Sequence, residues 1–358
     1  FGTPYQYRSN YSYNGDMWYG PISDQPSWFG TNRWISYKTT INRLANHDLG
    51  WPKVFQTDLG IDFDFFKIFS FKVNAYYKKI YDSIVNISSI IPGVYGLNNI
   101  SLMDNYTAQS LRGMDVTFGY SQSFGDFRVG ASLSATMYKA IYDKMTDDNW
   151  LYEYQKKTGT PVDAYWGYRC IGKYEDEDQL TSVPAISTAV KVGDLMYEDV
   201  NNDGRIDDND KVILGNTAPR LNYALNFTFG WKNLELNVVG TGRTGLKTAM
   251  TNSYFWNGWG DGNYSAFVRD NIGDAYPRLD YVHSDQNFVG SDFWLRNGSW
   301  FKIQSMELSY NLNLRQVSWI KGIKLSIKGQ NLLTLSGIKD VDPECIDAGV
   351  TSDPLLRS

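Results

Sequence analysis

Hydrophobic and polar residues alternate along several segments of the chain with a period of two. Between residues 55 and 65 the odd positions are mostly apolar: Phe55, Thr57, Leu59, Ile61, Phe63 and Phe65. The even positions include three carboxylates, Asp58, Asp62 and Asp64. Because successive side chains of a β-strand point to opposite faces, this segment predicts a strand with one apolar and one acidic face. Its length also matches the roughly 9–11 residues of a tilted strand that crosses a bilayer.

Seven further segments show the same alternation and predict strands: residues 69–78, 114–120, 127–137, 221–229, 234–238, 306–310 and 323–328. Short and long connections alternate between these segments. The short ones are at 66–67, 124–126 and 232–233, with a moderate one at 313–321. The long ones are at 82–110, 143–219 and 241–299, followed by a tail after Leu335. Long loops without structure are unusual in a compact soluble domain. Short turns that alternate with long loops are typical of an outer-membrane barrel. A soluble sandwich is the alternative, and it would bury Ile61 and Phe63 beneath a second sheet.

In a barrel, the polar strand positions would line the interior or contact a plug: Asp58, Asp62, Asp64, Lys72, Asn74, Arg128, Asn222, Asn226 and Glu235. Aromatic residues make up 16% of the chain, and several near the expected strand ends suit interfacial girdles: Tyr77, Tyr120, Tyr138, Trp231, Trp300 and Tyr310.

Composition narrows the chemistry of the 358-residue chain. Its net charge of −5 disfavours a nucleic-acid partner, which usually requires a basic face. Its two histidines, His47 and His283, lack zinc-site spacing, and no paired-carboxylate or G-x-S-x-G setting indicates catalysis. Cys170 and Cys345 could be bonded or free. The chain begins with Phe1 and shows no signal peptide, so we interpret it as a piece of a longer protein.

Short motifs follow one another along almost the whole chain. They are W-P-K-V-F-Q-T-D-L-G-I-D at 51–62, Y-Y-K-K at 76–79 followed by Asp82, Asn105 with R-G-M-D at 112–115, G-D at 193–194 leading to G-N at 215–216, S-W-F-K-I-Q-S-M-E-L-S-Y at 299–310, G-Q-N-L-L at 329–333 and D-P-E at 342–344. In this order they resemble the barrel of the SusC/RagA family of TonB-dependent outer-membrane transporters, found in Bacteroidota. Pro52 departs from the family pattern, which usually has Glu there.

The resemblance implies an all-β fold: an antiparallel transmembrane β-barrel segment, the C-terminal part of a 22-stranded plugged barrel, with long extracellular loops. The expected division is a loop region with a strand remnant at 1–50, four barrel strands at 51–142, a long extracellular loop at 143–218, two strands at 219–245, an aromatic-rich extracellular loop at 246–298, two strands at 299–335, and a loop leading to a missing last strand at 336–358.

The resemblance also implies a function: TonB-dependent import of an oligosaccharide or peptide nutrient across the outer membrane of a Gram-negative bacterium. The expected partners are a SusD-like surface lipoprotein as a lid, TonB–ExbB–ExbD acting through a missing N-terminal part, and outer-membrane lipid. The resemblance further suggests a dimer of transporter–lid pairs. The alternative is a SusC-like barrel that serves as a structural or assembly component of a larger outer-membrane complex. We do not expect an enzyme.

Residues 199–210 match the spacing of a calcium loop, D-x-N-x-D-G-x-I-D-x-x-D. The candidate Ca²⁺ ligands are Asp199, Asn201, Asp203, Arg205 through its backbone carbonyl, Asp207 and Asp210. Hard cations need six or more oxygens, and Gly204 permits the sharp turn that would bring them together. The alternative is a metal-free acidic turn, held by hydrogen bonds from the backbone to the same side chains.

A second cluster is rich in aromatic side chains. Its candidate contacts to a substrate or lid are Tyr254, Trp256, Trp259, Asp261 and Tyr264. Aromatic rings can stack on sugars or form the centre of a protein interface. The alternative is that these rings pack the loops against one another.

Overall fold

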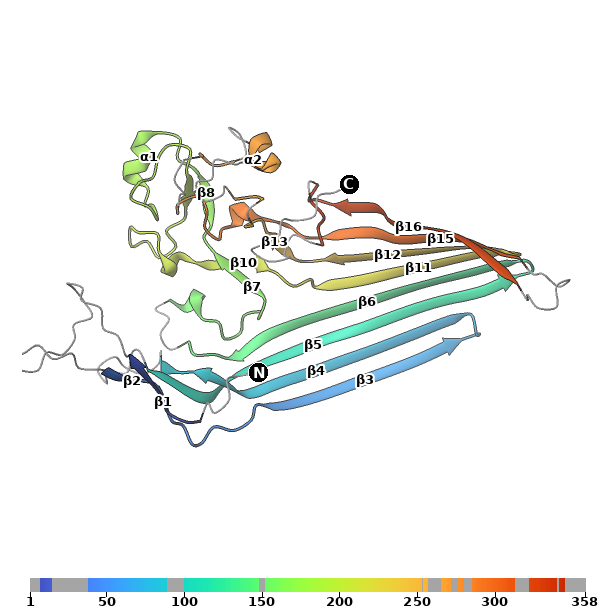
Figure 1. The fold of residues 1–358 in the computed structure, drawn as a ribbon, viewed down its shortest axis with the longest axis horizontal. Coiled ribbons are helices and arrows are strands. Elements are labelled where there is room, and N and C mark those ends of the chain that lie inside the picture. The colour runs from blue at the N-terminus through green and yellow to red at the C-terminus, as the bar shows by residue number, and fades with distance from the viewer. Residues whose placement is uncertain are drawn as a thin grey trace, which may run out of the picture.

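The computed structural model describes residues 7–14, 38–88, 100–147, 152–252, 254–256, 265–271, 276–279, 285–312, 322–339 and 341–344. Long antiparallel strands form one sheet, and smaller elements gather at one end of it (Figure 1). The strands of this sheet are β3 (Lys53–Phe65), β4 (Phe69–Asn86), β5 (Ser101–Phe124), β6 (Phe127–Lys144), β11 (Leu221–Trp231), β12 (Leu234–Thr244), β15 (Trp300–Leu312) and β16 (Ile323–Ser336).

Each of these eight strands pairs with the next in the order of the chain, which is the simplest antiparallel topology. All eight segments with alternating residues are therefore strands, and the predicted all-β fold is confirmed. Two short strands, β1 (Asn10–Asn14) and β2 (Lys38–Leu44), pair with each other, and β2 runs parallel to the start of β5. Within the described residues the sheet is open, because β3 and β16 each pair on one side alone.

Tight turns join the strands at the end of the sheet away from the small elements (Figure 1). The turn between β3 and β4 places Phe66 and Lys67 in the left-handed region, with φ of 55° and 57°. Gly125 takes the same conformation between β5 and β6, and Lys232 does so between β11 and β12. The amide of Lys232 donates to the carbonyl of Asp126 (2.9 Å), so neighbouring turns are joined to each other.

The opposite end of the sheet carries two long loops that contain structure of their own. Loop A (residues 145–220) holds the elements η3 (Glu153–Gln155), β7 (Ala164–Gly167), β8 (Cys170–Lys173), α1 (Glu177–Ser182), β9 (Leu195–Tyr197), η4 (Asp208–Asp210) and β10 (Val212–Asn216). Loop B (residues 245–299) holds β13 (Lys247–Ala249), α2 (Ala266–Asn271), η5 (Asp292–Trp294) and β14 (Leu295–Asn297). No helix in the described ranges has the length and apolar character needed to span a membrane.

Three clusters of buried side chains form the core of the molecule, and they lie in these loops instead of under the sheet. One centres on Leu195 and Tyr197 of loop A, and another on Val268 and Trp294 of loop B. The third joins Phe255 of loop B to the residues that follow β16.

Candidate functional site

The sheet has two chemically different faces, and the register of the strands makes each continuous. Phe63, Phe71, Phe118, Leu133 and Leu225 stand side by side on successive strands, and similar rows lie above and below them. We call this the apolar face. Ile61 is 57% exposed and Phe63 is 56% exposed, so neither lies beneath a second sheet. The sandwich alternative is therefore wrong.

An exposed apolar surface of this extent is far larger than a soluble monomer normally shows. The exposed side chains continue across the sheet to Phe227 on β11, Leu308 on β15 and Leu325 on β16. Aromatic rings concentrate at the end with the tight turns: Phe69 contacts Tyr120 at 5.3 Å between ring centroids, and Phe127 stacks on Trp231 at 6.3 Å. The face is thus an apolar band with an aromatic border, the pattern that a barrel presents to lipid.

Two aromatic residues expected at such a border lie on the other face. Tyr138 lies in one row with Gly113 and Tyr76. The adjacent row, which contains Met114 and Met137, points to the apolar face, so Tyr138 points to the polar face. Trp300 pairs with Arg243, because an irregularity between Ile303 and Ser305 reverses the alternation of β15. Tyr138 and Trp300 are therefore not part of the aromatic border.

The opposite, polar face carries the positions predicted to line an interior. Asp62 pairs with Lys72, and their ion pair measures 3.2 Å. Arg128 lies 4.0 Å from Glu235 across β11. Asp62, Lys72 and Arg128 are largely exposed, so each pair contributes little stability and these charges face the polar side of the sheet.

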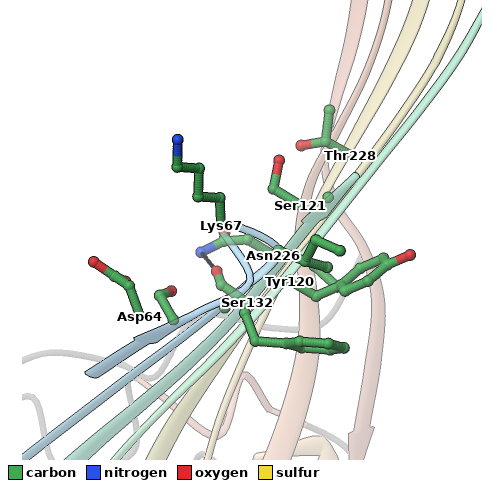
Figure 2. Close-up of a pocket in the computed structure, with 13 residues that line it drawn as sticks. Asp64, Lys67, Tyr120, Ser121, Ser132, Asn226 and Thr228 are labelled. Carbon is green, nitrogen blue, oxygen red and sulfur yellow. Dashed lines mark hydrogen bonds between the residues drawn. The ribbon is translucent and has the colours of Figure 1, made fainter. Parts of the chain in front are cut away.

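A hollow of 530 Å³ lies on the polar face near the tight turns (Figure 2). Its lining includes small residues, Ser70, Gly119, Ser121, Gly130 and Ser132, together with the charged residues Asp64 and Lys67. Figure 2 shows Ser121 and Thr228 on the opposite side of the sheet from the ring of Tyr120. The amide of Asn226 donates to the hydroxyl of Ser132 (3.3 Å). The hollow offers hydroxyl and amide groups to a polar surface rather than a reactive pair.

A buried polar network joins loop A to loop B. The Asp194 carboxylate of loop A is fully buried and accepts from the Asn287 side chain (2.8 Å) and from the Arg278 guanidinium (3.1 Å), both of loop B. Asn287 in turn accepts from the amide of Leu195 (2.9 Å).

Gln286 makes a second connection between the two loops. Its side chain donates to the carbonyl of Leu195 (2.6 Å) and accepts from the amide of Ile186 (2.9 Å), and its carbonyl accepts from the Tyr197 hydroxyl (2.8 Å). Burial raises the pKa of Tyr197, so its hydroxyl stays protonated and remains a donor. Because Gln286, Leu195 and Tyr197 are fully buried, their mutual bonds are strong and hold the two loops together.

A third anchor lies where the polar face meets the loops. The ammonium of Lys302 on β15 is 2% exposed and donates to Asp342 (2.7 and 3.0 Å) and to Glu344 (2.6 Å). Arg243 on β12 donates to the carbonyl of Pro343 (3.0 Å). The D-P-E motif is therefore fixed to the sheet by contacts that no local sequence pattern indicates.

The predicted calcium loop folds as a series of turns capped by acidic side chains. Asp199 accepts from the amides of Asp203 (3.2 Å) and Gly204 (2.8 Å), and Asp203 accepts from the amide of Arg205 (2.9 Å). Gly204 has φ of 81°, as the sharp turn requires. Asn201 also accepts from the amide of Asp203 (2.9 Å).

The last position of this loop is committed to the backbone. Asp210 is fully buried and accepts from the amides of Val200 (2.9 Å) and Asp207 (2.8 Å). The oxygen donors are of the type that Ca²⁺ prefers. The described part of the chain nevertheless contains no group of three or more His, Cys, Asp or Glu side chains close enough to hold a metal. Calcium binding thus stays a prediction.

Only part of the aromatic candidate cluster can be placed. Tyr254 lies against Phe255 (5.1 Å between centroids), and Trp256 lies against Phe288 (5.8 Å) and Trp294 (6.0 Å). Both therefore pack within the loops. Trp259, Asp261 and Tyr264 lie outside the described residues.

Comparison with known proteins identifies relatives of one kind. The chain is 24% identical over 329 residues to TonB-dependent receptor P26 of Formosa agariphila, an alignment that covers 85% of this chain and 32% of the relative. It is 22% identical over 348 residues to the TonB-dependent receptor SusC of Bacteroides thetaiotaomicron, covering 90% of this chain and 32% of SusC. The homologues of this chain are TonB-dependent receptors.

The fold of this receptor homologue agrees with that relationship. It is similar to the solved structure of the RagAB peptide importer in the open-open state, with a TM-score of 0.66, 17% identity, and coverage of 96% of this chain and 36% of that one. No family model matches the chain. The chain spans about a third of the length of these relatives. Its homologues are receptors rather than enzymes, which is consistent with a chain that has no catalytic role.

Proposed function

We propose that this chain forms part of the wall and the extracellular loops of a TonB-dependent outer-membrane importer of the SusC/RagA type. The observation that carries the proposal is the sheet with two faces: eight consecutive antiparallel strands with a continuous exposed apolar face and a charged opposite face. In a soluble protein the apolar face would contact water, and each Å² of exposed apolar surface would cost about 25 cal/mol of free energy. Hydrocarbon removes that cost.

The open edges of the sheet support the same proposal. Unpaired backbone groups at β3 and β16 are not tolerated in lipid, so further strands would have to pair there and close the wall. We infer that the polar face lines the interior and contacts a plug. The hollow of small residues would then accept plug side chains, and the tight turns would face the periplasm.

For the cargo and the lid, we propose an oligopeptide or oligosaccharide nutrient and a SusD-like lipoprotein that rests on loops A and B. The rigid connection between these loops supports a docking role, because a lid needs a firm rim to close against. Tyr254 and Trp256, with Trp259, Asp261 and Tyr264, remain the proposed contacts to substrate or lid. Two transporter–lid pairs would form a dimer, and TonB–ExbB–ExbD would act on the plug.

Calcium remains a proposal for residues 199–210. Asp199, Asn201, Asp203, Asp207 and the Arg205 carbonyl would supply oxygen atoms, and the ion would hold the loop rather than take part in transport. Asp210 would contribute least, because both of its oxygens already accept backbone hydrogen bonds.

The test is uptake in cells. Radiolabelled oligopeptides and oligosaccharides are supplied to the producing bacterium and to a strain that lacks this protein, each with and without a protonophore. We expect energy-dependent uptake of one of the two nutrient classes, lost in the deletion strain, and co-purification of a surface lipoprotein with the tagged protein. Equal uptake by both strains, with the protein retained in an outer-membrane assembly, would instead support the scaffold alternative.

A further inference from the structure

On β4, β5 and β6 the apolar face ends, on the side of the long loops, in a row that contains two cations. Four rows of mainly apolar residues, which begin at Phe69, Phe71, Val73 and Ala75 of β4, cross β5 and β6. The next row on the same face contains Tyr77, Arg112 and Lys139. The length of the apolar band along β5 follows from the sequence. Eight residues separate Tyr120 from Arg112, which is roughly 27 Å at about 3.4 Å per residue.

A strand tilt of about 40° reduces this distance to roughly 20 Å along the membrane normal, close to the apolar band of about 25 Å in outer-membrane barrels. Arg112 and Lys139 are both exposed. They therefore project from the lipid-facing surface at the level where hydrocarbon gives way to head groups.

These two cations are directly opposite each other and share no counter-charge. The register pairs Arg112 with Lys139, and like charges in this arrangement destabilise a sheet. Neither side chain has an ion pair or a side-chain hydrogen bond to any other described residue.

The charged groups nearby are engaged elsewhere. Asp143 lies 3.8 Å from the Lys79 ammonium and accepts from the Ser110 hydroxyl (2.8 Å). Asp82 pairs with Lys53 (2.8 Å), and the ammonium of Lys144 lies 3.8 Å from the centroid of the Tyr106 ring. Two positive charges on the apolar side of the wall are left without a partner in the described part of the chain.

We propose that Arg112 and Lys139 bind a phosphate group carried by an anionic lipid of the outer leaflet. A guanidinium binds phosphate through two parallel hydrogen bonds, and a neighbouring ammonium adds a point charge. The phosphate would relieve the repulsion between the two cations. The occupant is a lipid because the pair projects from the apolar face, beside rings and aliphatic chains that contact acyl groups. This inference rests on the proposed membrane location.

The test uses the native protein, purified from its outer membrane and reconstituted in nanodiscs that contain diphosphoryl lipid A, dephosphorylated lipid A or neither. Binding of lipid A is measured by native mass spectrometry, and thermal stability is measured in parallel. We expect phosphorylated lipid A to bind and to raise Tm, whereas dephosphorylated lipid A does not raise it. The double variant Arg112→Gln, Lys139→Gln should lose about thirtyfold in affinity, as expected for two charges near a membrane surface.

The matched control is Lys72→Gln, Lys78→Gln, which removes two positive charges from the polar face of β4. It should bind phosphorylated lipid A as the unmodified protein does. Equal losses in both double variants, or equal stabilisation by the phosphorylated and dephosphorylated lipids, would overturn the proposal, as would equal stabilisation by inorganic phosphate. A protein that fails to insert into nanodiscs at all would instead contradict the membrane location on which the proposed function rests.

Discussion

The buried ion pair of Lys302 predicts an asymmetry between its two sides. Removing the acids with Asp342→Ala and Glu344→Ala would leave an ammonium that is 2% exposed, and an uncompensated buried charge costs about 3–5 kcal/mol. Lys302→Met leaves the acids instead. Their side chains are 26% and 45% exposed and can be hydrated, so we expect a loss of about 1.5–3 kcal/mol, the value of hydrogen bonds to charged groups.

Hydrogen–deuterium exchange of residues 341–344 measures this difference, because the contact holds Asp342 and Glu344 to β15. At about 1.4 kcal/mol for each factor of ten, the double alanine variant should accelerate exchange by roughly a hundredfold to a few thousandfold, and Lys302→Met by roughly ten- to a hundredfold. Lys324→Met, at an exposed pair with Glu307, is the control and should change little. Unchanged exchange in the double variant, or a larger effect from Lys302→Met, would refute the reasoning.

Three further outcomes are expected. Leu133→Arg on the apolar face should cost about 2–4 kcal/mol of unfolding free energy in lipid vesicles, whereas Ser132→Arg on the polar face should cost much less; equal costs would contradict the assignment of the faces. Terbium luminescence should report an ion bound in the loop, and Asp199→Asn with Asp203→Asn should abolish the signal; a signal unaffected by these changes would exclude this site. Asp194→Ala should cost about 3 kcal/mol and expose both loops to limited proteolysis together, and cleavage of loop A alone would show that the loops are not coupled.

The strands could be predicted from the sequence because each has one apolar and one polar face, which produces an alternation with a period of two. The alternation from Phe55 to Phe65 requires only that one face be apolar, and β3 extends from Lys53 to Phe65 as that pattern indicates. The polar positions, such as Asp62 and Asn226, followed from the same period. The likeness to TonB-dependent receptors followed from motifs spread along these strands and the segments that follow them.

The contacts between distant segments could not be predicted in this way. In β15, Met306 and Leu308 occupy even positions on the apolar face. An unbroken alternation would therefore place Lys302, also an even position, on the apolar face. An irregularity near Ile303 reverses the alternation and places Lys302 on the polar face, where it meets Asp342. Likewise, no local pattern connects Asp194 with residues more than 80 positions later. Such pairings depend on tertiary structure that period-two patterns do not encode.

The coupling of loops A and B has a consequence for how these loops can be exchanged between proteins. A grafted loop that lacks the matching residues would leave Asp194 without Arg278 and Asn287, or leave those two without their acceptor. Changes in either loop therefore have to preserve Asp194, Arg278 and Asn287 as a set, or lie in segments that leave the network untouched. Chimaeras that exchange the two loops as a single cassette should fold where single exchanges fail.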